Sequence, residues 1–193
     1  MTITRIAVAL RLAVAVLQLH GTPWISSNYG LGHLFFPTNG SAPEIPLFEP
    51  AYVSRTFITA NVASVEPPVV SEARIRGKNP LVYALGVSLM ELVYGRLPAL
   101  AKSSELDPQG NETPNTEMLV AVRLLKQIRD DEPGNYAHAT ASCVHCEFGY
   151  PYDHSLDDDQ FRAKFIERVI IPLKEDYDAI ASARGRVSGY QCN

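Results

Sequence analysis

Residues 80–94 read PLVYALGVSLMELVY, and this stretch decides the fold that the sequence predicts. A helix formed by this stretch would be apolar on almost every side, and a helix of that kind is buried on all sides. Asn79 is suited to cap the first turn, and Pro80 to occupy its first position. Gly95 is typical of a helix end. We therefore expect a central helix over residues 80–94, against which the other helices pack.

A second helix is predicted over residues 3–19. Apolar residues recur there at helical spacing and form one broad face: Ile6, Leu10, Ala13, Val14 and Leu17. Gly21 and Pro23 then end the helix. The same apolar run also resembles a signal peptide. Two features favour a buried helix instead: Arg11 lies in the middle of the run, and the run is shorter than the roughly 20 residues that a bilayer requires.

The C-terminal half of the chain is predicted to be helical, with polar connections. Residues 99–113 are polar and rich in turn formers, which favours an exposed loop. Thr113-Pro114 then opens a helix. Its buried face is expected to comprise Met118, Val122, Leu125 and Ile128. Residues 130–134 end this helix, and a shorter one follows over residues 135–146.

A long helix is predicted after Ser155. Ser155 and Asp158 resemble a capping box, with Asp in place of the usual Glu. One side of the helix is apolar and comprises Phe161, Phe165, Ile166 and Val169. Pro172 is expected to kink or end the helix. The tail after Ala183 is expected to fray.

Residues 25–75 favour loops and short strands. Leu34-Phe35-Phe36 is a brief apolar run before a Pro-Thr-Asn-Gly turn signal at 37–40. Three prolines between residues 43 and 50, and then Pro67-Pro68, disfavour helices. A loop-rich stretch of this length in a compact domain is typical of a functional region.

The composition indicates one globular domain whose partner is not a polyanion. The chain has 193 residues, of which 46% are hydrophobic and 20% charged, and this is enough for a packed core. Its net charge of -4 argues against nucleic acid or an anionic membrane as a partner, since both require a basic face. Three cysteines without framework spacing favour a reducing, intracellular setting, namely the cytoplasm.

Part of the sequence resembles the large lobe of a protein kinase. Val82–Val87, continued by Gly95–Pro98, looks like the buried central helix of kinases. Leu17–His20 looks like the end of the helix before a kinase catalytic loop, and Leu34-Phe35-Phe36 falls where the next strand belongs. The resemblance implies a mainly α, protein-kinase-like C-terminal lobe over residues 2–183, with a few short β-strands and without the small lobe.

A closer resemblance is to a family of uncharacterised fungal proteins with a kinase-like C-terminal half. Five segments in the same order carry it, and they are Leu19–Trp24, Tyr52–Phe57, Asn79-Pro80 with Ala84–Gly86, Cys143–Phe148 and Ser155–Asp158. Together they span most of residues 2–175. Members of that family often carry a helical N-terminal region of the prion-inhibition and propagation type, which implies a further domain outside this chain.

The sequence departs from the kinase pattern at the residues that carry phosphoryl transfer. That chemistry needs an Asp for the substrate hydroxyl proton, an Asn and a second Asp for magnesium, and a Lys on the phosphates. Ile25–His33, where the catalytic loop is expected, contains no Asp, and His33 stands near the metal-binding Asn position. No Asp-Phe-Gly occurs, and Leu47–Pro50 lies roughly in its place. Leu81 replaces the Asp that begins the buried helix of kinases. We therefore expect no catalysis by this chain alone.

A cysteine pair admits both a functional and a structural explanation. Cys143 and Cys146, with His138, His145 and His154 nearby in sequence, invite a zinc site. A structural zinc needs four ligands, usually as two spaced pairs, and only one cysteine pair is present. The sequence therefore favours Cys143 packed inside a short helix and Cys146 near its end.

Other polar groups also have two explanations. Asp157–Asp159 suggests a metal cluster, but acidic residues at a helix start already favour the helix dipole. Asp130–Glu132 is expected to be a solvated loop. Ser54–Thr56 is either a phosphorylation or docking segment or an ordinary turn, and Trp24 is either a core anchor or a ligand stack. Ser, His and Asp all occur, but the Gly-x-Ser-x-Gly elbow of hydrolases does not.

The favoured function is a non-catalytic, kinase-like domain that acts as a signalling or scaffold interaction module. No catalytic residue, metal ligand or cofactor is assigned. Its partner is expected to be another protein or an N-terminal domain outside this chain. Two alternatives stay open: a truncated remnant or gene fragment without independent function, and a phosphotransferase completed by another chain. The domain is expected over residues 2–183, followed by a frayed tail over 184–193.

Overall fold

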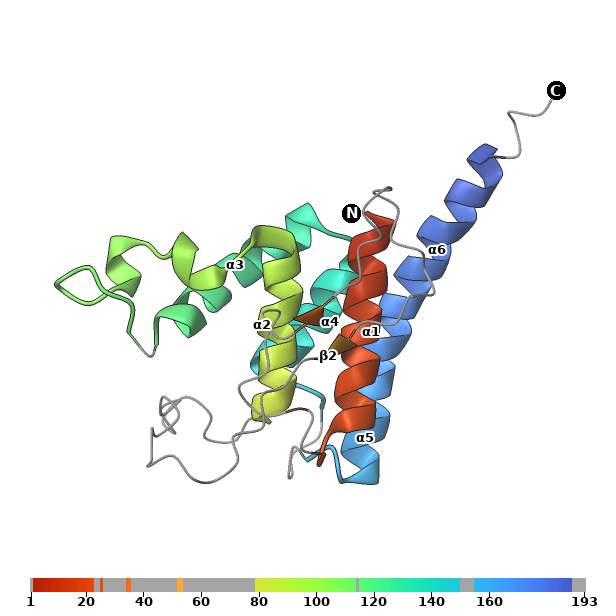
Figure 1. The fold of residues 1–193 in the computed structure, drawn as a ribbon, viewed down its shortest axis with the longest axis horizontal. Coiled ribbons are helices and arrows are strands. Elements are labelled where there is room, and N and C mark those ends of the chain that lie inside the picture. Colours follow the sequence, from red (N-terminus) through yellow and green to blue (C-terminus); the bar gives the residue numbers. More distant parts are fainter. Residues whose placement is uncertain are drawn as a thin grey trace.

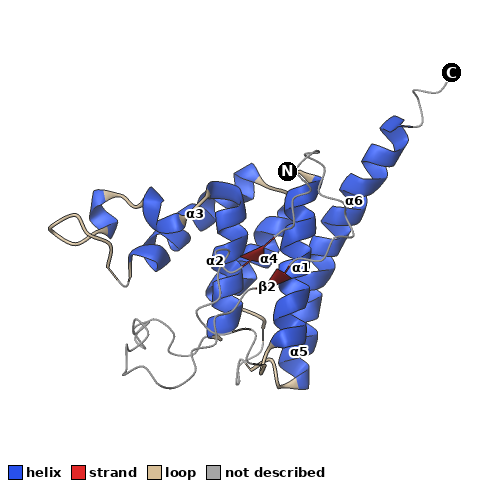
Figure 2. Cartoon of the chain, in the orientation of Figure 1, coloured by secondary structure: helices blue, strands red, loops and turns tan. Residues whose placement is uncertain are grey.

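The computed structural model describes residues 2–22, 25, 34–35, 52–53, 79–113, 115–149 and 155–188. Within these residues the chain is mainly α, as predicted (Figure 2). In chain order the helices and strands are α1 (Ile3–Leu19), β1 (Leu34–Phe35), β2 (Tyr52–Val53), α2 (Pro80–Tyr94), α3 (Thr116–Asp131), α4 (Gly134–His145), α5 (Asp159–Phe165) and α6 (Ile171–Ser188). Two 3-10 turns, η3 (Leu97–Leu100) and η4 (Ser103–Glu105), lie between α2 and α3, and a π-helical turn, η5 (Ile166–Ile170), joins α5 to α6.

Four helices form the body of the molecule. α1 contacts α2, α2 contacts α4, α4 contacts α6, and α6 returns to α1, so these helices close a ring around a shared apolar core. Figure 1 shows α3 with its two 3-10 turns on the side of α2 that faces away from α6, and α6 extending past the other helices. α3 packs on α4 and η3 from outside the ring.

α2 is the buried helix that its sequence predicts. The side chain of Asn79 accepts hydrogen bonds from the backbone N–H groups of Leu81 and Val82, at 3.0 and 3.1 Å, so it caps the first turn. Gly95 ends the helix with a φ of 83°, which glycine adopts without strain. Every residue from Ala84 to Met90 is buried, and these residues span all sides of the helix. The prediction of central burial is confirmed over this middle part, whereas both ends of α2 are half-buried.

A close contact in the core joins α2 to α4 at Gly86. A Cβ atom at this position would lie 2.8 Å from both the backbone nitrogen and Cγ2 of Val144, and 3.0 Å from Cβ of Cys143. Only a residue without a side chain fits this space. Near the N-terminal end of α4, the buried hydroxyl of Tyr136 donates to the carbonyl oxygen of Leu89 in α2 at 2.7 Å. The two helices are therefore fixed both in separation and in register.

α1 has the predicted bounds, but its buried face is rotated from the expected one. Of the five apolar residues predicted to face the core, only Ile6 and Ala13 are fully buried, and the other three are half-buried. The observed buried face comprises Ile3, Ile6, Val8, Ala9, Leu12, Ala13 and Val16. α1 packs against both α2 and α6, so two neighbours determine which side is covered. Among the described helices, none combines the length and the hydropathy that crossing a membrane requires.

The connection between α2 and α3 is more ordered than the exposed loop predicted for residues 99–113. Glu105 is buried, and both of its carboxylate oxygens accept hydrogen bonds from Arg123 of α3, at 2.7 and 3.0 Å. This guanidinium is the main reason that the pKa of Glu105 lies below its ordinary value. The hydroxyl of Thr116 also donates to the Glu105 carbonyl at 2.7 Å. The prediction of an exposed, turn-rich connection therefore holds for most of these residues and is wrong at Glu105, because this charge pair folds that part of the segment onto α3.

The N-terminus of α4 is capped from another helix. Pro133 offers no side-chain hydrogen bond to the first turn. Instead, the backbone N–H of Tyr136 donates to Oδ2 of Asp176 on α6 at 3.0 Å. A carboxylate in this position also interacts favourably with the helix dipole. Burial is the main reason that the pKa of Asp176 is raised.

The C-terminal helix begins and continues differently from the prediction. Its cap is Asp158, whose Oδ1 accepts from the N–H groups of Gln160 and Phe161, both at 2.8 Å. Ser155 makes only a local turn, since its hydroxyl accepts from the Asp157 N–H at 3.2 Å. The predicted Ser155 capping box is therefore wrong, because an Asp directly before the helix satisfies the same amides.

The helix also continues through Pro172 rather than ending there. The N–H of Ile171 bonds to the carbonyl of Ile166, which is the i to i−5 spacing of a π turn. Proline lacks an amide hydrogen and crowds the carbonyl four residues before it. The π turn rearranges the backbone hydrogen bonds next to this proline, so the chain stays helical. α6 runs to Ser188, beyond the boundary expected at Ala183.

Two short strands lie where brief β structure is expected. Leu34 pairs with Val53 and Phe35 pairs with Tyr52, in antiparallel orientation. This pairing joins the apolar run at residues 34–36 to the segment that begins at Tyr52. It is visible near the front of α1 and α2 in Figure 1.

Gly86→Ala tests the α2–α4 contact. Overpacking a filled core costs about 1–3 kcal/mol, and the higher helix propensity of Ala offsets about 1 kcal/mol of this. We expect a net loss in the free energy of unfolding, measured by urea denaturation followed by circular dichroism. Gly134→Ala, at the start of α4, is the matched control because a Cβ there meets no atom within 4 Å. Equal stability of both variants would contradict the contact.

Ser88→Ala tests an unpaired hydroxyl in the core of α2. Ser88 is fully buried, and its Oγ has no hydrogen-bond partner in the part of the chain that the structure describes. Removing this hydroxyl is expected to raise the free energy of unfolding by about 1 kcal/mol. Thr140→Val is the counterpart, since the Thr140 hydroxyl donates to the Tyr136 carbonyl at 2.8 Å and its loss is expected to destabilise. A lower free energy of unfolding for Ser88→Ala than for the unchanged protein would contradict the conclusion that this hydroxyl is unpaired.

Candidate functional site

One end of the bundle gathers described residues from four of the five segments that carry the family resemblance. α1 and α4 end there, and α2 and α5 begin there (Figure 1). The backbone N–H of Asn79 donates to Sγ of Cys146 at 3.4 Å, which joins the start of α2 to the end of α4. The ring of His20 reaches Asp157, which joins the end of α1 to the start of α5. We call this region the junction end.

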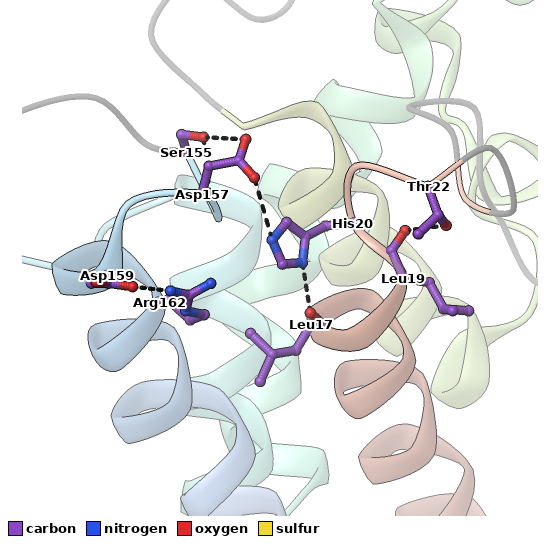
Figure 3. Close-up of polar contacts among 8 residues, drawn as sticks. All are labelled: Leu17, Leu19, His20, Thr22, Ser155, Asp157, Asp159 and Arg162. Atoms are coloured by element: carbon purple, nitrogen blue, oxygen red, sulfur yellow. Dashed lines mark hydrogen bonds and ion pairs between the residues drawn. The ribbon is translucent and has the colours of Figure 1, made fainter.

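His20 is held between two acceptors at the junction end (Figure 3). Its Nδ1 lies 2.6 Å from the carbonyl oxygen of Leu17. A carbonyl oxygen only accepts hydrogen bonds, so Nδ1 is the protonated nitrogen of the neutral ring. Nε2 lies 3.5 Å from Oδ1 of Asp157, and it donates to that carboxylate only as an imidazolium. The side chain of His20 is 17% exposed, so the ring serves mainly to close α1 onto α5.

The Ser, His and Asp side chains at this end do not form a hydrolase triad. In a triad the histidine contacts the serine, and the carboxylate orients the histidine from behind. Here Asp157 lies between the two, because the Ser155 hydroxyl donates to its Oδ2 at 3.3 Å while His20 faces its Oδ1 (Figure 3). His20 is therefore not placed to accept the Ser155 proton. This geometry agrees with the missing Gly-x-Ser-x-Gly elbow.

Cys143 and Cys146 occupy the positions that the sequence favours. Cys143 is fully buried inside α4, and burial raises the pKa of its thiol well above the ordinary value. Cys146 ends the helix in the left-handed region, with a φ of 54°. Its N–H bonds to the Cys143 carbonyl, and the next N–H bonds to the Ser142 carbonyl, which is the Schellman pattern. Both thiols thus belong to the packing of the α4 end.

Within the described residues, the histidines that are close to Cys143 and Cys146 in the sequence do not form a metal site with them. His138 is exposed and His145 is half-buried. No group of three or more His, Cys, Asp or Glu side chains in the described ranges is arranged to hold a metal ion. His154 and Cys192 lie outside those ranges.

The acidic runs act in helix formation and packing. Asp158 caps α5 and Asp159 lies in its first turn, so the helix-dipole explanation is confirmed. The expectation of a solvated loop at residues 130–132 is wrong: Asp130 and Asp131 are exposed but belong to the last turn of α3, and Glu132 is buried. Its side chain is 4% exposed, and Nη1 of Arg5 in α1 lies 2.5 Å from its Oε1. Sequence reasoning missed this ion pair because its residues are 127 positions apart in the sequence.

Several predicted residues lie outside the part of the chain that the structure describes. These are Trp24, His33, Leu47–Pro50 and Ser54–Thr56. The interpretations of these residues stay predictions.

The outer surface of α3 carries exposed apolar residues that the sequence interpretation placed in the core. Val122 is 46% exposed, and Met118 is half-buried rather than buried. Leu125 and Ile128 are buried as predicted. The observed core face comprises Val120, Ala121, Leu124, Leu125 and Ile128. α3 has apolar residues on two sides, so periodicity alone did not distinguish the covered side from the open one.

The open side of α3 forms a single ridge of four residues. Leu119 and Val122 are 42% and 46% exposed, and Lys126 and Arg129 are also exposed. Their spacing of three, four and three residues places them in one line along the helix. Leu100 of η3, 39% exposed, lies beside this line, because its carbonyl accepts from Arg123 at 2.8 Å. We call these four residues of α3 the α3 ridge.

Comparison with known protein families identifies the chain at the family level. Residues 2–180 match the family described as a domain of unknown function, DUF7580. This chain belongs to that family. No curated protein and no solved structure matches it. The DUF7580 match begins before α1 and extends into α6, so it includes the four-helix ring, the junction end and α3.

The buried thiol of the DUF7580 domain predicts a loss of stability in alkali. The folded domain keeps Cys143 protonated at pH values where the unfolded chain has lost this proton, because burial raises the folded pKa. The contribution of Cys143 to the free energy of unfolding is therefore complete below about pH 8.5, the ordinary thiol pKa. This contribution falls as the pH rises above that value. The slope reaches at most about 1.4 kcal/mol per pH unit for one proton.

Urea denaturation between about pH 7.5 and pH 9 measures this slope, below the pH of about 10 at which tyrosines ordinarily titrate. Cys143→Ala is expected to lower stability overall but to flatten the pH dependence. An equal slope in both proteins would contradict the assignment to Cys143.

Proposed function

We propose that this DUF7580 domain is a non-catalytic, kinase-like module that acts through contacts with another protein or with a domain outside this chain. The observation that carries the proposal is the exposed apolar surface on α3. Of the four large apolar side chains that are exposed in the described residues, two belong to this surface, Leu119 and Val122, and a third, Leu100, lies in η3, which packs on α3. Exposed apolar residues that gather in one place are typical of protein contact sites.

The order of elements supports the kinase-like part of the proposal. α1 ends at Leu19, two short strands pair at residues 34–35 and 52–53, and the capped, buried α2 follows. The kinase resemblance implies this order of elements for residues 17–94. The burial of Ala84–Met90 also agrees with the central helix that Val82–Val87 resembles.

The use of the polar residues at the junction end supports a non-catalytic role. His20, Asn79 and Asp158 each bond to backbone or side-chain groups that join or cap helices. Phosphoryl transfer requires charged groups that meet the phosphates, the metal and the substrate hydroxyl. The sequence lacks an Asp over residues 25–33 and has Leu81 where kinases begin the buried helix with Asp. The polar side chains at the junction end are suited to joining and capping helices.

The net charge of the chain favours a protein as its partner. The chain has a net charge of -4, whereas nucleic acids and anionic membranes select basic surfaces. The proposal therefore includes no nucleic acid and no membrane.

A thermal-shift titration with ATP and magnesium tests the non-catalytic role. A ligand present at 100 times its dissociation constant stabilises a protein by about 2.7 kcal/mol, which raises the Tm of a domain of this size by roughly 5–10 °C. We expect no saturable rise in Tm up to millimolar ATP, and no transfer of labelled phosphate to the domain or to a model substrate.

An active protein kinase serves as the positive control in both assays. A saturable rise in Tm would overturn the proposal in favour of a phosphotransferase completed by another chain. A purified domain that forms only aggregates, without a cooperative unfolding transition, would instead favour a remnant without independent function.

A further inference from the structure

Arg168 of η5 lies in a fixed place beside the segment that follows α4. Phe148 of that segment packs on Phe161 and Phe165, with ring centroids 5.0 and 6.1 Å apart, and all three side chains are fully buried. The next residue, Gly149, has a φ of 70°, which glycine adopts without strain. A Cβ atom at Gly149 would lie 3.5 Å from Nη2 of Arg168, so the guanidinium lies against this part of the backbone. The aromatic contacts therefore fix the surroundings of Arg168.

The guanidinium of Arg168 has hydrogen-bond donors that no described residue uses. An arginine side chain carries five N–H donors and keeps its charge in proteins. Nε of Arg168 is buried and has no hydrogen-bond partner among the described residues. The two Nη atoms are not buried, and they make no hydrogen bond or ion pair in that part of the chain either. The side chain is half-buried and has lost part of its hydration, so an acceptor at its open Nη edge would lower its free energy.

Neighbouring groups do not supply this acceptor. Glu167, the preceding residue, bonds to Nζ of Lys164 at 2.7 Å. Glu147, two residues before Gly149, is exposed and forms no ion pair with Arg168. A cation near the C-terminus of α4 is favourable because of the helix dipole, but this leaves the N–H donors of Arg168 without acceptors.

We infer that Arg168 binds one carboxylate group of a protein partner through its two Nη atoms. The planar guanidinium matches the two oxygens of a carboxylate with a pair of parallel hydrogen bonds. A phosphate group carries up to two negative charges, and here it would meet a single cation close in sequence to two exposed carboxylates, Glu147 and Glu167. A single carboxylate balances the charge of Arg168 without this excess. The inference rests on the proposed function, because it names a chemical group that the protein partner presents.

NMR titration of the whole ¹⁵N-labelled chain tests the inference. The probe is a blocked tripeptide whose central residue is glutamate, and the same peptide with glutamine measures contacts that need no carboxylate. We expect a saturable shift of the Gly149 amide signal with the glutamate peptide alone. Arg168→Gln is expected to raise the dissociation constant by about tenfold or more. Arg162→Gln is the matched control on the same continuous helix, because its half-buried guanidinium already pairs with Asp159.

Arg168→Lys gives a second measurement, since it keeps the charge but lacks the planar pair of donors. We expect its affinity to lie between those of the unchanged protein and Arg168→Gln, and circular dichroism verifies that each variant is folded. The inference is overturned if the glutamate peptide gives no saturable shift, if the glutamine peptide binds equally well, or if Arg162→Gln weakens binding as much as Arg168→Gln. Tighter binding of inorganic phosphate than of the glutamate peptide overturns the assignment to a carboxylate. These outcomes differ from failure of the proposed function, which would appear as ATP-dependent stabilisation whatever the peptide titration shows.

Discussion

The close approach of α2 and α4 at Gly86 is the constraint on which the rest of the structure depends. The missing side chain lets the backbone of Val144 occupy space that a Cβ atom would fill. At this separation the buried Tyr136 hydroxyl reaches the Leu89 carbonyl at 2.7 Å. A wider spacing would break this bond and leave a buried carbonyl and hydroxyl to be satisfied elsewhere. α1 and α6 complete the ring only because α2 and α4 already present one continuous apolar surface.

Charged residues hold the outer elements to this pair. The Arg5–Glu132 ion pair joins α1 to the turn between α3 and α4, and Asp176 caps α4 from α6. Arg123 and Glu105 fold the polar connection onto α3. Each contact joins residues that are distant in sequence, and at least one member is buried or half-buried. Ionisable side chains that would suggest chemistry in the sequence are therefore engaged in joining helices.

The surface that this packing leaves exposed includes the open side of α3. The core side of α3 is covered by α4 and η3, while its opposite side keeps two large apolar residues in solvent. The junction end uses its polar groups internally, whereas the ridge from Leu119 to Arg129 does not. In the role that we propose for this DUF7580 domain, the open side of α3 holds a partner.

Local sequence determined α2, its Asn79 cap, its end at Gly95 and the burial of Cys143, because these follow from backbone hydrogen bonding and from an apolar run without a polar side. The sequence did not predict that the segments at the junction end meet, because their contacts join residues that are distant in the chain. Only the tertiary structure decided that Glu132 is buried and that Val122 is exposed. A periodic pattern shows that a helix has an apolar side, but the neighbours that cover a side come from distant parts of the chain. When two sides of a helix are apolar, tertiary packing decides which side is buried. When a charged residue has a partner far away in the sequence, tertiary packing likewise decides whether that residue is buried.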